Sequence, residues 1–124
     1  MAYDPFVKPD ERSWLALSEA QRIDHVLDYH RRSQMVSPSA RLHAALHVTV
    51  ENQLAEQQAA PVAALERLMA SGIDRHEAIH AIASVAAAQM QRVVRERRPF
   101  DQAAYEQDLL ALTTEDGKDS PSGA

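Results

Sequence analysis

The chain has 124 residues, the size of one ordinary domain, so we expect a single hydrophobic core. A formal net charge of -5 is poorly suited to holding a phosphate backbone, so we expect no nucleic-acid partner. The absence of cysteine excludes disulfides, thiolate zinc sites and cysteine nucleophiles. Neither a secretory signal nor an apolar run long enough for a bilayer is visible, so we expect a cytoplasmic protein of bacterial type with no membrane partner.

The composition favours an all-α fold. Only 5% of the residues are aromatic and alanine is abundant, so small and aliphatic side chains must form the core. With 3 glycines and 6 prolines, the chain encodes few turns, which suits helices joined by short loops. We therefore predict a compact antiparallel bundle of about five helices.

The first predicted helix follows an irregular arm. Residues 1–17 contain two prolines, and we expect Trp14 in this arm to cap the core. A serine and a glutamine at capping-box spacing then start a helix over 19–32, whose apolar face includes His30. We interpret His30 as a satisfied core histidine, with an additional metal ligand as the alternative.

A Ser-Pro pair predicts the next helix, over 38–58, because serine is a good N-cap and proline fits the first helical position. Its expected core stripe consists of Leu42, Leu46, Val50 and Leu54. At 100° per residue, His43, His47 and Glu51 form a second row directly beside that stripe. This row should face the interior or its border.

Three more helices complete the expected single domain, which spans 18–112. We predict them over 61–71, 75–97 and 102–112, bounded by prolines, glycines and aspartate caps. The core positions of the helix over 75–97 are Ile79, Ile82, Ala83, Ala86, Met90 and Val93. Residues 113–124 lack apolar periodicity, and we expect them to form a disordered tail.

The segment from His76 to His80 matches the pattern HExxH. On a helix this spacing stacks two imidazoles one turn apart, so that both can bind one ion. Glu77 then lies near enough to activate a bound water, and it is our candidate catalytic residue. The alternative is that Asp74 and Glu77 form an acidic capping box and that Glu77 only starts the helix.

A second histidine pair strengthens the metal interpretation. His43 and His47 repeat the spacing of one helical turn, and Glu51 extends their row by another turn. Burying four imidazoles without partners is costly, and coordination of a metal ion offsets that cost. We therefore predict a divalent-metal site formed by His43, His47, Glu51, His76 and His80.

The metal ion and its number stay open at this point. Imidazole and carboxylate ligands are compatible with Zn, Fe, Mn, Ni and Cu, of which we favour Zn or Fe. Three or four histidines suit one ion, whereas adding Glu51 and Glu77 gives enough ligands for two. A single ExxH element makes the match to di-iron bundles only partial.

The stretches LHAALHVTVENQLAEQQAAP and RHEAIHAIASVAAAQMQ resemble the bacterial proteins of domain-of-unknown-function family 1841. The resemblance covers roughly residues 40–110. It rests on Leu42, His43, His47, Glu51, Gln53, Pro61, His76, Glu77, Ala78, His80, Gln91 and Tyr105. It implies a fold and a site but no activity, since that family has no settled function.

Two classes of function follow from these observations. The first is a metal-binding helical bundle, either a small hydrolytic or redox metalloenzyme or a metal-handling protein. The second is a non-catalytic interaction module, in which the histidines are structural and the alanine-rich helix docks a partner or a second copy of the chain. The sequence does not decide whether the protein is an enzyme.

Overall fold

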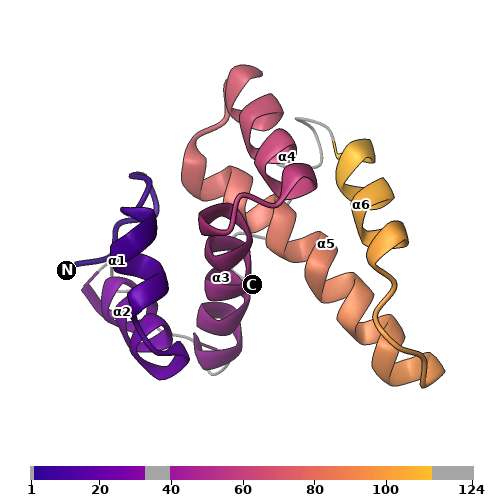
Figure 1. Ribbon diagram of the computed structural model, residues 1–124, viewed down its shortest axis with the longest axis horizontal. Coiled ribbons are helices and arrows are strands. Elements are labelled where there is room, and N and C mark those ends of the chain that lie inside the picture. The colour runs from indigo at the N-terminus through magenta and orange to yellow at the C-terminus, as the bar shows by residue number, and fades with distance from the viewer. Residues whose placement is uncertain (1, 33–39, 113–124) are drawn as a thin grey trace.

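The computed structural model describes residues 2–32 and 40–112, and it confirms the predicted all-α fold (Figure 1). The described residues form the helices α1 (Glu11–Ala16), α2 (Glu19–Arg32), α3 (Ala40–Ala55), α4 (Ala59–Ala70), α5 (Arg75–Glu96) and α6 (Gln102–Ala111). None of these helices is long and apolar enough to cross a membrane. The predicted disordered tail over 113–124 lies outside the described residues.

The N-terminal arm is more ordered than expected. The prediction of an irregular arm over 1–17 is wrong for α1, which starts where the Asp10 side chain accepts a hydrogen bond from the backbone N–H of Ser13 at 3.0 Å. Trp14 of α1 is fully buried, and its indole N–H donates to Asn52 at 2.9 Å. The arm is therefore fixed against α3.

Local capping explains where most of the helices begin and end. The predicted capping box of α2 is present, with Ser18 and Gln21 bonded to each other's backbone N–H at 2.8 and 3.1 Å. Helix α3 ends three residues before the expected position 58, since Gln57 has a left-handed φ of 58°. Helix α4 begins two residues before Pro61, which fits because proline is tolerated in a first turn.

Helix α3 stands between two groups of helices, as Figure 1 shows. On one side, the N-terminal arm, α1 and α2 pack on α3 around a cluster made of Tyr3, Trp14, Val26, Ala44 and Val48. On the other side, α4, α5 and α6 pack with α3 around a larger cluster that includes Leu68, Ile79, Ile82, Tyr105 and Leu109. A side chain on α3 can therefore be reached from α2 and from α5.

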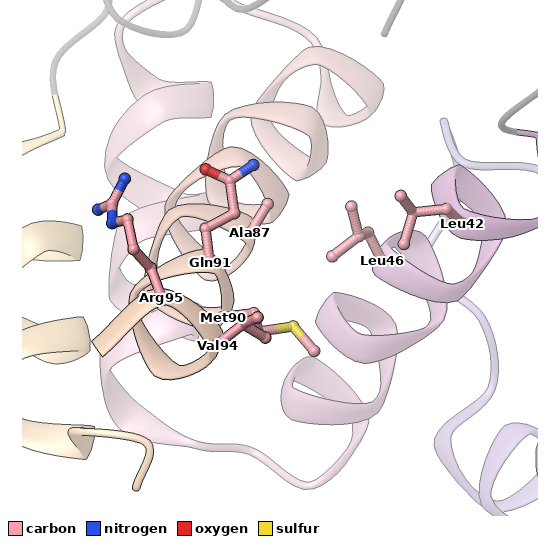
Figure 2. Close-up of a pocket in the computed structure, with 7 residues that line it drawn as sticks. All are labelled: Leu42, Leu46, Ala87, Met90, Gln91, Val94 and Arg95. Atoms are coloured by element: carbon pink, nitrogen blue, oxygen red, sulfur yellow. The ribbon is translucent and has the colours of Figure 1, made fainter. Parts of the chain in front are cut away.

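The predicted core stripe of α3 is wrong at its first position. Leu42 is 64% exposed, and the buried face of the helix instead follows Ala44, His47, Val48 and Glu51. Leu42 lies on an open apolar groove of about 460 Å³ between α3 and α5, together with the half-exposed Met90 (Figure 2). His47 and Glu51 of the predicted row are therefore interior and His43 is partly buried, whereas Leu42 lies on the exposed side of the helix.

Candidate metal centre

Five histidine rings gather where α2, α3 and α5 meet. Helix α2 contributes one residue, and α3 and α5 contribute two each: His30, His43, His47, His76 and His80. The centroids of neighbouring rings lie 4.3 to 5.3 Å apart. Imidazoles bound to one ion at about 2.1 Å would have centroids roughly 4.5–5.3 Å apart. The ring spacing therefore matches that of a metal-ligand set.

The cluster consists of two triads that share one residue. His30, His43 and His47 form the first triad, and we call it the α2 triad. His47, His76 and His80 form the second, the α5 triad. In each triad the candidate ligand atoms lie within 4.8 Å of one another. All four predicted histidines are thus brought together, and His30 joins them.

Several ring nitrogens in this cluster are buried without a hydrogen-bond partner among the described residues. They are both nitrogens of His30 and the Nε2 atoms of His47, His76 and His80. Leaving one polar atom in this condition costs about 1–3 kcal/mol. Buried polar atoms are normally satisfied by protein groups, water or an ion, so these nitrogens are available to such a partner.

Burial keeps these imidazoles neutral at physiological pH. Burial first, and the neighbouring histidines second, lower the pKa of His30 to about 4 and that of His80 to about 3. Burial also holds the pKa of His47 well below its ordinary value. The pKa of His76 is lowered too, although the nearby Asp74 opposes the shift. Neutral imidazole is the form that binds metal ions, so the cluster needs no deprotonation at pH 7.

Glu51 occupies a different position from the one expected of a ligand. It is 1% exposed, and its two oxygens accept hydrogen bonds from the Arg75 guanidinium, both at 2.8 Å. One of these oxygens also accepts the hydroxyl proton of Tyr3 at 2.6 Å. Glu51 belongs to neither triad. The carboxylate of Glu51 therefore takes part in a buried ion pair, and its role as a metal ligand stays a prediction.

This ion pair reaches the histidines through Tyr3. The Tyr3 hydroxyl lies 3.5 Å from Nδ1 of His47, at the outer limit of a hydrogen bond. Because the hydroxyl proton is donated to Glu51, the Tyr3 oxygen can only accept from Nδ1–H of His47. We assign the Nδ1 tautomer to His47 on this ground, which leaves a lone pair on Nε2 for a metal ion.

Glu77 is exposed, and it also lies outside both triads. Its backbone N–H donates to the Asp74 side chain at 2.8 Å, so Asp74 is the N-cap of α5. This is the start of the capping box that was the alternative interpretation of the motif. The predicted role of Glu77 as a general base therefore finds no support in the geometry.

Sequence reasoning missed the residues that cover the cluster. The Phe6 ring packs edge-on against the His76 ring, with 5.2 Å between the ring centroids. The centroid of the Tyr29 ring lies 5.8 Å from those of His30 and His76. Arg75 also donates to the carbonyl oxygen of Pro5 at 3.0 Å, which holds the arm over the site. Phe6 and Pro5 are far from His76 in the sequence, so no local pattern identifies them as its cover.

The sequence from residue 15 to residue 111 matches the model of one protein family, described as a domain of unknown function (DUF1841). The chain belongs to this family. The match confirms the predicted resemblance and extends it over α2, so the family domain includes His30. No curated protein and no solved structure matches the chain.

Proposed function

We propose that this DUF1841 protein binds a transition-metal ion in its histidine cluster. The observation that carries the proposal is the set of buried ring nitrogens on His30, His47, His76 and His80 that have no partner among the described residues. They come from three helices, burial lowers the pKa of each of these imidazoles, and the candidate ligand atoms of each triad lie within 4.8 Å of one another. Structural histidines would be expected to direct these nitrogens at hydrogen-bonding groups.

The donor set favours some metals over others. Both triads consist of imidazoles alone, and imidazole suits Zn, Fe, Cu and Ni. Mn prefers oxygen ligands, and the carboxylate of Glu51 is engaged by Arg75. We propose Zn or Fe as the resident ion, with Cu and Ni as the ions that would compete for the same ligands.

A metal-handling role fits the site better than hydrolysis does. A hydrolytic metal site needs a base beside the metal-bound water. Glu51 is neutralised in its ion pair and Glu77 is exposed, so neither acidic residue predicted for the site is placed for that task. The aromatic rings of Phe6 and Tyr29 also cover His76.

Metal analysis of purified protein tests the proposal. Untagged wild-type protein should carry metal in near-stoichiometric amount, and the variant His47→Ala should carry none, because His47 is shared by both triads. The matched control is His25→Ala, which removes the one histidine outside the cluster and should leave the metal content unchanged. Wild-type protein that stays metal-free after incubation with Zn, Fe, Cu or Ni would refute the proposal.

A further inference from the structure

The two triads sharing one histidine raise the question of how many ions the cluster holds. We infer that the α2 triad and the α5 triad are alternative positions of a single ion, which passes between them while His47 remains its ligand. This inference rests on the proposed function, since it requires the cluster to bind metal. It makes the site a place of metal transfer and not a two-metal catalytic centre.

The first argument is the lone-pair count of His47. Its Nδ1 faces the Tyr3 hydroxyl, whose own proton is committed to Glu51. That leaves Nε2, which is buried and has no partner among the described residues, as its single metal-binding atom. One nitrogen lone pair binds one ion at a time. Because both triads require His47, occupancy of one excludes occupancy of the other.

The second argument is charge. Two-metal sites bring two dications close together and offset their repulsion with negatively charged ligands. The triads contain only neutral imidazoles. The nearest buried carboxylate, Glu51, already balances the positive charge of Arg75 at 2.8 Å. A second dication in the cluster would therefore be repelled by the first, with no negatively charged ligand to offset the repulsion. A single ion meets no such repulsion.

The third argument is placement. His47 is fully buried in the middle of α3, while each triad is completed from a different neighbouring helix. The α2 triad also contains the partly exposed His43, and the α5 triad contains His76, which is 9% exposed. The rings of Phe6 and Tyr29 cover His76, so the α2 triad, through His43, is the more exposed of the two positions. An ion that enters at the α2 triad could pass to the α5 triad while it stays bound to His47.

The experiment is a titration of metal-free full-length protein with Co(II), followed by visible absorption and by calorimetry. The variants are His30→Ala, which leaves the α5 triad complete, His80→Ala, which leaves the α2 triad complete, and the double variant. His25→Ala is the control. Glutamine variants at positions 30 and 80 retain side-chain volume and are used if an alanine variant loses its helical circular dichroism.

We expect one Co(II) per chain in wild type and in both single variants, with affinity reduced less than roughly tenfold in each. The two single variants should differ in their d–d absorption bands, because their ligand sets differ. The double variant lacks a complete triad and should bind at least about a hundredfold more weakly.

Two results would overturn the inference while leaving metal binding intact. Two ions per wild-type chain would show a dinuclear centre. Loss of binding in either folded single variant would show a single site that requires the replaced histidine, with no alternative position for the ion. Wild-type protein that binds no Co(II), Zn or Fe is a different result, because it refutes the proposed function itself.

Discussion

Replacing Glu51 with glutamine separates the two roles that this residue can have. The substitution keeps the shape of the side chain but leaves the Arg75 guanidinium, which is 5% exposed, without its counter-charge. Breaking one side of a buried ion pair costs about 3–5 kcal/mol. A domain of this size is stable by about 5–15 kcal/mol, so the loss is a large fraction of the total.

The loss is measured by urea denaturation of the metal-free protein. With a slope of about 2 kcal/mol per M, the midpoint should fall by roughly 2 M in Glu51→Gln. Tyr3→Phe removes one hydrogen bond to the same carboxylate and should cost about 1.5–3 kcal/mol. The double variant Glu51→Leu/Arg75→Met removes both charges together and should be more stable than Glu51→Gln. Glu66→Gln, at an exposed position, is the matched control.

The same variant reports on the metal site. If Glu51 orients His47 through Tyr3, Glu51→Gln should still bind one ion, with affinity reduced about 10–100-fold. A variant as stable as wild type would refute the reasoning about the ion pair. A folded variant that binds no metal would instead make Glu51 a ligand, as the HxxxHxxxE pattern predicts.

Further predictions concern pH, packing and the HExxH glutamate. The pKa of His30 is about 4 and that of His80 about 3 in the folded protein, below the ordinary value of 6.5. As the pH falls, these histidines therefore take up protons in the unfolded chain before they do so in the folded protein. The metal-free protein should therefore lose about 2 kcal/mol per histidine between pH 7 and pH 5 in urea titrations, and a constant midpoint would contradict this. Ile79→Ala should cost about 2–5 kcal/mol because the side chain is fully buried, whereas Leu42→Ser should change stability by less than about 0.5 kcal/mol in the same assay. Glu77→Ala should leave the metal content at the wild-type level, and a metal-free variant would restore Glu77 to the site.

The sequence predicted the helices better than their packing. Helices α5 and α6 lie within one residue of the expected bounds, because Asp74 and Asp101 cap them locally. Helix α1 was missed because six residues give too short a pattern to recognise. The buried face of α3 was predicted in a shifted position because hydrophobicity alone favoured Leu42. The face that is actually buried contains a charged residue, Glu51, and a histidine, His47.

The site was predicted as far as local spacing allows. Two HxxxH pairs place four rings on two helices, and the structure brings these rings together. His30 has no such partner on its own helix, so only the packing of α2 on α3 shows that it belongs to the cluster. The contacts of Glu51 with Arg75 and Tyr3 span 24 and 48 positions of the chain, which no local pattern reveals.

The energetics of the cluster link the fold to its proposed use. At least four buried imidazoles have a nitrogen without a partner among the described residues, which at about 1–3 kcal/mol each amounts to a penalty of roughly 4–12 kcal/mol. That penalty is comparable to the whole stability of a small domain. Histidine rings of α2 contact those of α3, and rings of α3 contact those of α5, so the cluster joins the helices on the two sides of α3. An ion in the α2 triad would tie α2 to α3, and an ion in the α5 triad would tie α3 to α5, so in either position metal binding and folding would be coupled.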